Sequence, residues 1–120
     1  MTSDTGVVGW GECYASTVGP KAMRAVIEDV FERHMMGTSP EDIELMYRRV
    51  YSSGFTQRPD PTVMGAFAGL EIACWDILGK RAGMPVNQLL GGKCRDGVDP
   101  YRHASGKDFK SVEEQVRKYV

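Results

Sequence analysis

The sequence predicts an α+β fold in which a β-hairpin remnant precedes a bundle of helices and one strand–helix unit follows it. Three observations support this prediction. A glycine-interrupted run of strand type lies near the start, apolar residues recur at helical spacing through most of the chain, and a strand, a loop and a helix follow one another at the end. The order strand, loop, helix is that of the first unit of a βα repeat.

The hairpin remnant consists of a turn at residues 4–6 (DTG) and a strand at residues 7–13 (VVGWGEC), which two glycines interrupt. A strand that follows so tight a turn normally pairs with a strand before it. Only residues 1–3 precede this turn. We therefore expect the first strand of the hairpin to be missing from the chain.

The next segment is predicted to form two amphipathic helices. The first covers residues 20–36 and ends at Gly37, because glycine readily takes the left-handed conformation of a helix end. Ser39 is expected to cap the second helix, with Pro40 in its first turn, and the loop at residues 52–61 (SSGFTQRPDP) ends it. The expected buried positions are Met23, Val26, Ile27, Val30, Phe31, Ile43, Met46, Tyr47, Val50 and Tyr51.

A third and longer helix is predicted from about residue 62 to residue 82. Gly83 suits a left-handed cap and Pro85 blocks continuation, and a single helical turn then leads to a glycine pair. Asp76 and Lys80 lie one turn apart and are predicted to form an ion pair. The wide apolar face of this helix consists of Ala66, Phe67, Leu70, Ala73, Cys74, Ile77, Leu78 and Ala82.

The last part of the chain is predicted to hold the strand–helix unit. Residues 93–97 form a polar link, residues 98–103 a short strand, and residues 104–110 a loop. Ser111 and Glu114 have the spacing of a capping box, which predicts that a helix opens at Ser111.

Composition and charge argue against several classes of function. The formal net charge of -1 gives no electrostatic reason for binding nucleic acid or an anionic membrane. No apolar run approaches the length needed to cross a bilayer, and the N-terminus lacks the basic start and apolar segment of a secretory signal. Cys13, Cys74 and Cys94 are odd in number and far apart, which predicts reduced thiols and a cytoplasmic location.

No motif for phosphate or metal binding is complete. The Gly-Trp-Gly run at residues 9–11 lacks the third glycine of a dinucleotide fingerprint. The cysteines show no two-residue spacing, and His34 and His103 are isolated in the sequence. We expect Cys74 to be a small core residue and His34 to face solvent at the end of its helix.

The run at residues 71–92, EIACWDILGKRAGMPVNQLLGG, resembles the N-terminal capping domain of the mandelate racemase and muconate lactonizing enzyme family, within the enolase superfamily. The resemblance implies a capping domain at residues 1–95 that lacks its first strand. It also implies that residues 96–120 begin a TIM-type barrel. We therefore expect a fragment truncated at both ends.

The resemblance also implies a chemistry. Members of the family hold Mg²⁺ through carboxylates at barrel strand ends and remove a proton next to the substrate carboxylate, and the metal stabilises the enediolate that forms. These groups would lie beyond the chain, so we assign no catalytic residue and no metal ligand within it. The cap closes the active site and sets which substrate fits, and full-length members commonly form homo-oligomers.

The resemblance places candidate substrate-binding residues in two segments. In the family, the loop after the second helix leans over the barrel mouth, where Phe55 would offer an apolar wall and Gln57 and Arg58 would hydrogen-bond hydroxyls or a carboxylate. His103 would face the substrate from the first barrel strand, because YRHASG is similar to the corresponding segment of mannonate-dehydratase-type members. Two alternatives stay open: a solvated loop with Phe55 packed on the domain, and a histidine bonded to nearby backbone.

The expected function is therefore that of a fragment of a Mg²⁺-dependent sugar-acid dehydratase, a lyase acting on an aldonate of the galactonate or mannonate type. Racemases, epimerases and cycloisomerases of the same family share the cap and remain alternatives. A non-enzymatic helical interaction domain that folds alone is a further alternative, since no catalytic cluster is visible in the sequence.

Overall fold

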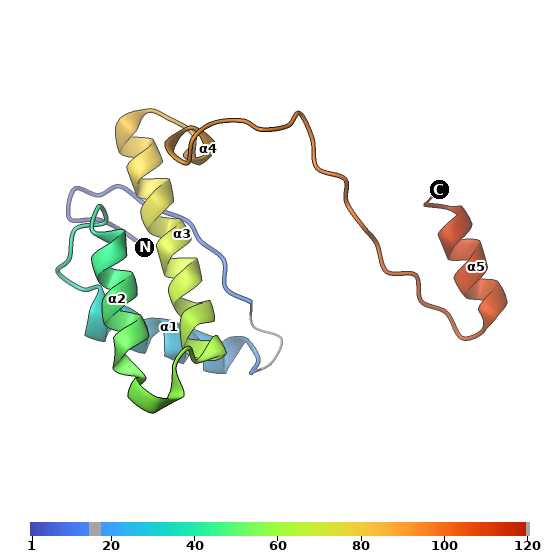
Figure 1. Ribbon diagram of the computed structural model, residues 1–120, viewed down its shortest axis with the longest axis horizontal. Coiled ribbons are helices and arrows are strands. Elements are labelled where there is room, and N and C mark those ends of the chain that lie inside the picture. Colours follow the sequence, from blue (N-terminus) through green and yellow to red (C-terminus); the bar gives the residue numbers. More distant parts are fainter. Residues whose placement is uncertain (15–17, 120) are drawn as a thin grey trace.

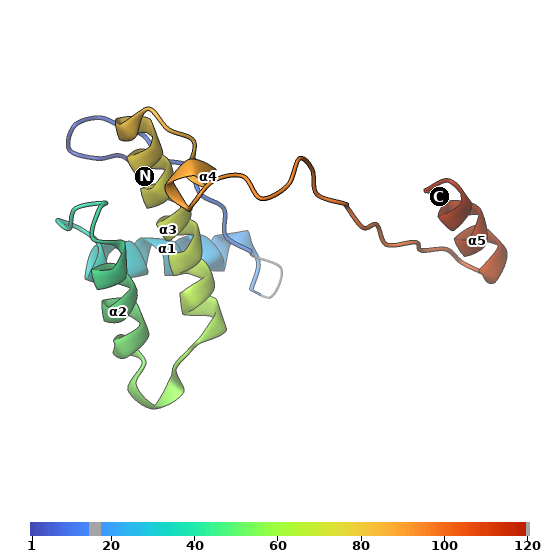
Figure 2. The same ribbon diagram turned by 45° about the horizontal axis from the view of Figure 1, so that its top comes forward.

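The computed structural model describes residues 1–14 and 18–119 of the chain. A group of helices surrounds one long central helix, and an extended segment leads from this group to a last helix (Figures 1 and 2). The elements are α1 (Pro20–His34), α2 (Ile43–Ser53), the 3-10 helix η1 (Phe55–Gln57), α3 (Pro61–Ala82), α4 (Val86–Leu89) and α5 (Phe109–Arg117).

The core forms where α1 and α2 pack against α3. The predicted apolar face of α3 is buried from Ala66 to Ile77, whereas Leu78 is half-buried and Ala82 is exposed. Phe67 lies at the centre, with 1% of its surface exposed. The other buried apolar residues are Met23 and Val30 of α1, Met35, and Ile43, Met46 and Val50 of α2.

The ends of the helices follow local rules, with one correction. Gly83 takes the predicted left-handed conformation, with φ of 64°, and its N–H donates to α3 carbonyls. Ser39 was expected to cap α2, but Asp42 occupies that position and the helix begins at Ile43. The Ser39 hydroxyl instead accepts from the N–H of Glu41, at 3.3 Å, because Pro40 and Glu41 form a turn ahead of the helix.

The predicted strand at residues 7–13 is wrong for this structure. Within the described residues the segment makes one isolated antiparallel bridge, between Thr2 and Val8, and no strand. The N–H of Gly9 also donates to the carbonyl of Met1, at 2.8 Å. A strand needs a ladder of partners, and the three residues before the turn supply only this short pairing.

Beyond the bridge, the N-terminal segment lies directly on the backbone of α3. A Cβ atom built on Gly11 would overlap the carbonyl oxygen of Gly69, and one on Gly9 would overlap that of Ala73. Gly69 on the helix side likewise faces the Cys13 thiol. Because glycine has no Cβ atom, Gly9 and Gly11 allow the segment to lie close against the backbone of α3.

Two side chains of α3 form hydrogen bonds with the backbone of residues 8–10. The Asp76 carboxylate accepts from Lys80 Nζ at 2.6 Å, which confirms the predicted pair, and from the Trp10 N–H at 2.8 Å. Lys80 also donates to the carbonyl of Val8, at 2.8 Å. The hydrogen bond from Lys80, followed by that from Trp10, lowers the pKa of Asp76 below its usual range. The ion pair thus joins α3 to the N-terminal backbone.

Asp76→Ala is expected to lower the melting temperature and to release residues 8–10 from α3. The contribution of Asp76 is present above the unfolded pKa of about 3.9 and is lost as the pH falls further, because its folded pKa is depressed. Thermal unfolding and hydrogen exchange of the Trp10 amide measure both effects. Glu28→Ala is the control, since it removes only the exposed α1 pair with Arg24. Equal shifts in the two variants would contradict this role.

The predicted strand at residues 98–103 is not formed in this structure and stays a prediction. The chain is extended over this stretch (Figure 1) but joins no ladder, since the part of the chain that the structure describes holds no strand beside it to accept and donate hydrogen bonds. The last helix begins at Phe109, earlier than expected. Its cap is Asp108, which accepts from the Ser111 N–H at 2.8 Å, so Ser111 fills the third position of the capping box.

By length and composition, α3 is apolar enough to cross a membrane, so the expectation that no segment reaches that length is wrong. In the structure, 44% of its most apolar window is buried within the chain. The central helix of a folded core meets the same criteria, and the packing of α1 and α2 on α3 supports that interpretation.

Candidate functional site

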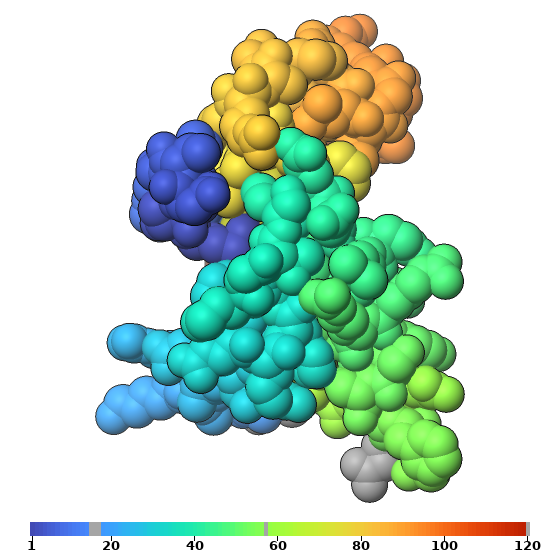
Figure 3. All heavy atoms as spheres, turned by 90° about the vertical axis from the view of Figure 1, so that its left-hand side faces the viewer, coloured from blue at the N-terminus to red at the C-terminus, as the bar shows by residue number. Residues whose placement is uncertain are grey.

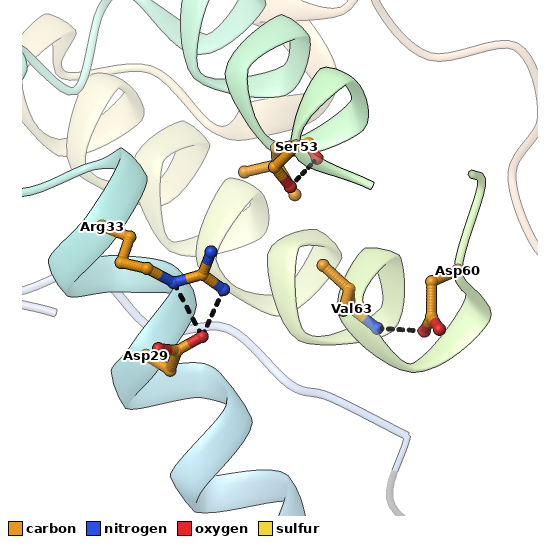
Figure 4. A network of polar contacts seen from close by, with 6 residues as sticks. Asp29, Arg33, Ser53, Asp60 and Val63 are labelled. Carbon is orange, nitrogen blue, oxygen red and sulfur yellow. Dashed lines mark hydrogen bonds and ion pairs between the residues drawn. The ribbon is translucent and has the colours of Figure 1, made fainter. Parts of the chain in front are cut away.

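The loop between α2 and α3 is held at both ends. At the α2 end, the Ser53 hydroxyl donates to the carbonyl of Val50, at 2.7 Å. At the α3 end, the Asp60 carboxylate accepts from the N–H of Thr62 at 2.8 Å. It also accepts from the N–H of Val63 at 3.0 Å, as Figure 4 shows. These bonds fix where the loop leaves one helix and enters the next.

Phe55 stands out from this loop. Its side chain is 78% exposed, so the alternative in which it packs back on the domain is wrong. Its φ of 39° lies in the left-handed region, which a residue with a large side chain rarely adopts. Phe55 therefore presents an apolar surface to solvent on this loop.

Arg58 returns from the loop toward α2. Its guanidinium carbon lies over the ring of Tyr51, 5.6 Å from the centroid, and the side chain as a whole is exposed. Gln57 is the last residue of η1. The structure therefore brings Phe55, Gln57 and Arg58 into one short loop.

Tyr47 and Tyr51 behave differently from the prediction that both lie on the buried side of α2. Tyr51 is half-buried and Tyr47 is 39% exposed. Their rings stack at 5.9 Å, one helical turn apart, and Tyr47 lies against Phe67 at 6.1 Å. The sequence signal for the stacked tyrosines was their i, i+4 spacing on α2.

His103 lies apart from that loop. The extended segment that carries it leaves the far end of α3 through α4, whereas the loop lies at the opposite end of α3 (Figures 1 and 2). The His103 ring is exposed and meets the edge of Tyr101 at 5.2 Å. Because its segment forms no strand, the expected inward direction of His103 at a barrel mouth has no support here.

His34 does not face solvent as expected. It is half-buried, and its Nε2 atom is buried without a hydrogen-bond partner, so burial lowers the pKa of the imidazole. Cys74 is fully buried in the core, and burial raises the pKa of its thiol to about 11, which makes it unreactive. The interpretation of Cys74 as a core residue is confirmed.

The residues present do not form a metal site. Among residues 1–14 and 18–119, no three His, Cys, Asp or Glu side chains gather closely enough to hold a metal ion. The Mg²⁺ that the family resemblance implies therefore has no ligand set in this part of the chain, and no step through a metal is assigned to it.

A cavity of about 480 Å³ lies at the other end of α2 from the loop. It is enclosed by residues 1–5, by the connection between α1 and α2, and by Arg81, with Cys74 and Ile77 among its apolar lining residues. Figure 3 shows this face, with the N-terminal residues in dark blue beside the connection between α1 and α2. None of the candidate residues Phe55, Arg58 and His103 lines it.

Comparison with known proteins gives the chain a family. Residues 1–91 match the model of the mandelate racemase / muconate lactonizing enzyme N-terminal domain. A D-galactonate dehydratase family member from Paenibacillus sp. is 37% identical over 120 residues, and one from Musicola paradisiaca is 39% identical over 116 residues. The chain spans 29% and 27% of the length of these two relatives.

Solved structures agree with this match. A mandelate racemase/muconate lactonizing enzyme from Sulfitobacter sp. is 75% identical over 79% of this chain and 24% of its own, with a TM-score of 0.74. A putative isomerase from Sinorhizobium meliloti is 28% identical over 98% of this chain and 31% of its own, with a TM-score of 0.78. The chain therefore belongs to the mandelate racemase / muconate lactonizing enzyme family of the enolase superfamily, and residues 1–91 are its N-terminal domain.

Proposed function

We propose that this chain is the substrate-capping part of a Mg²⁺-dependent sugar-acid dehydratase, which removes a proton next to the carboxylate of an aldonate of the galactonate or mannonate type. The observation that carries this proposal is the 37% identity across the whole chain to a D-galactonate dehydratase family member. The Mg²⁺ would be held elsewhere in the longer protein, since the described residues offer no ligand set.

The loop between α2 and α3 would form one wall of the pocket. Arg58 is exposed and makes no ion pair among those of the described residues, so its N–H groups are available for a carboxylate. Phe55 would line the apolar side and Gln57 would hydrogen-bond a hydroxyl. His103 would reach the same substrate only once its segment is built into a barrel.

The remaining parts of the proposal concern the whole protein. Residues 1–95 would form the cap and residues 96–120 the start of the barrel, and the extended chain before α5 is consistent with such a boundary. The free thiols of Cys13, Cys74 and Cys94 fit a cytoplasmic enzyme. A homo-oligomer is proposed on family grounds alone.

An isomerase, such as a racemase, epimerase or cycloisomerase, is the second candidate. Its support is the Sinorhizobium meliloti structure, which is described as a putative isomerase and matches 98% of this chain. Both reactions begin with proton removal next to a carboxylate, so the product distinguishes them. A dehydratase releases water and forms a 2-keto-3-deoxy acid, whereas a racemase or epimerase returns an acid of the same composition.

The test uses the full-length protein with Mg²⁺ and either D-galactonate or D-mannonate. We expect a 2-keto-3-deoxy product, and we expect Arg58→Ala and His103→Ala each to lower kcat/KM about ten- to a hundredfold, because each removes a hydrogen bond to a charged group. Melting temperatures of the same preparations verify folding. Arg24→Ala on the exposed face of α1 is the control and should leave kcat/KM unchanged. Full efficiency in both site variants would refute the site while leaving the family intact.

A further inference from the structure

A column of aromatic rings connects the core to the loop that carries Arg58. Tyr47 lies against the buried Phe67, with ring centroids 6.1 Å apart and planes inclined by 57°. Tyr51 stacks on Tyr47 at 5.9 Å and 19°. The guanidinium of Arg58 lies over the Tyr51 ring at 5.6 Å. The column therefore ends in a charged side chain of the candidate substrate-binding loop.

We infer that Tyr51 is a positioning residue, whose ring holds the Arg58 guanidinium in place to bind the carboxylate of the substrate. The inference rests on the proposed function for the identity of the ligand. It adds a residue of α2 to a site that otherwise consists of loop residues.

The chemistry of the contact suits this role. An exposed arginine has many rotamers, and an aromatic face attracts its positive charge without requiring its N–H groups. A substrate carboxylate can then accept two parallel hydrogen bonds from the same guanidinium. A carboxylate of the protein in place of the ring would occupy those donors, and none of the ion pairs of the described residues includes Arg58.

The backbone of the loop supports the same geometry. Gly54 lies against Arg58, since a Cβ built on Gly54 would come within 3.4 Å of the Arg58 Cβ. The chain therefore folds back on the end of α2, which brings Arg58 beside the last turns of that helix. The cap at Asp60 fixes the chain two residues later. Tyr51 is half-buried and its ring stacks on Tyr47, and this packing restricts the positions that the ring beneath the arginine can take.

Steady-state kinetics of the full-length protein with D-galactonate and Mg²⁺ provide the first test. Tyr51→Leu should raise KM about two- to tenfold with little change in kcat, and Tyr51→Phe, which keeps the ring, should stay near the wild-type value. In an Arg58→Ala background, Tyr51→Leu should have no further effect on KM. Tyr51→Gln is a second ring-free variant in case leucine disturbs folding. Equal effects of Tyr51→Leu in the two backgrounds would overturn the inference.

The second test does not depend on catalysis. In the 120-residue chain labelled with ¹³C,¹⁵N-arginine, the side-chain resonances of Arg58, identified by their loss in Arg58→Ala, should be shifted upfield by the Tyr51 ring. The shift should persist in Tyr51→Phe and disappear in Tyr51→Leu and Tyr51→Gln. A shift that is absent, or that survives loss of the ring, would overturn the contact itself. A ring-dependent shift with unchanged kcat/KM in Arg58→Ala would instead overturn the proposed substrate role of Arg58.

Discussion

Phe67→Ala is expected to lower the free energy of unfolding of the chain by about 3–5 kcal/mol, the usual cost of removing a buried phenylalanine. Phe67 is 1% exposed and lies where α2 and α3 meet, in contact with Tyr47. Its removal leaves a cavity that rigid neighbours on two helices cannot fill. Chemical denaturation measures the loss, because the midpoint should fall at an unchanged slope.

Phe55→Ala is the matched control for this variant, since it deletes the same atoms from a side chain that is 78% exposed. We expect its unfolding free energy to stay within about 0.5 kcal/mol of the wild-type value. Similar losses in the two variants would show that Phe55 is buried in solution. That result would also remove Phe55 from the candidate substrate-binding surface.

Gly11→Ala is expected to destabilise the chain by about 1–3 kcal/mol and to detach the N-terminal segment from α3. The added methyl group would overlap the carbonyl oxygen of Gly69, a backbone atom of a helix that cannot rotate away. The segment must therefore move, which strains the hydrogen bonds of Val8 and Trp10 to Lys80 and Asp76. Thermal unfolding and exchange of the Trp10 amide report the two consequences.

Gly65→Ala provides the comparison, because Gly65 lies in α3 one turn before Gly69 and has no heavy atom within 4 Å of the added Cβ. Alanine favours a helix over glycine, so this variant should gain about 0.5–1 kcal/mol. The two substitutions are chemically identical and are predicted to have opposite signs. A stable Gly11→Ala variant with a protected Trp10 amide would disprove the close approach.

The helices could be predicted from the sequence because their signals are local. The apolar spacing in α3, the stop at Gly83 and the pairing of Asp76 with Lys80 all depend on residues within a turn or two of one another. Errors at helix ends arose where two capping residues compete. Ser39 and Asp42 both precede α2, and the helix begins after Asp42, whose side chain makes no capping hydrogen bond. At α5, Asp108 is the cap and Ser111 lies within the helix.

The two predicted strands do not form in this structure because a strand is defined by its partners. Residues 7–13 have strand composition, but in this structure most of them pack on a helix, and the described residues hold no strand beside residues 98–103. From the sequence, Gly9 and Gly11 were interpreted only as interruptions of a strand, and the structure shows that they allow close approach to the α3 backbone.

The candidate site was located in the loop from residue 52 to residue 61 through family resemblance, since an exposed loop carries no chemical signal of its own. Phe55, Gln57 and Arg58 share this loop, and their role in substrate binding stays a prediction. The contact of Arg58 with Tyr51 depends on how the chain turns back at Gly54, which residue spacing does not encode. The expected place of His103 depends on a predicted barrel strand, and a strand forms only with partner strands.

The contact between residues 8–11 and α3 permits only one alignment of the two segments. The carbonyl of Val8 and the N–H of Trp10 form hydrogen bonds with Lys80 and Asp76, which lie one helical turn apart on α3. Gly11 passes over Gly69 so closely that a Cβ atom would overlap the Gly69 carbonyl oxygen. A slip of one residue would place Trp10 or Glu12 over that carbonyl and move both backbone groups away from Lys80 and Asp76. An inserted residue should therefore be tolerated in the turn at Gly6, where a built Cβ meets no heavy atom within 4 Å, and should destabilise the contact when placed between Trp10 and Gly11.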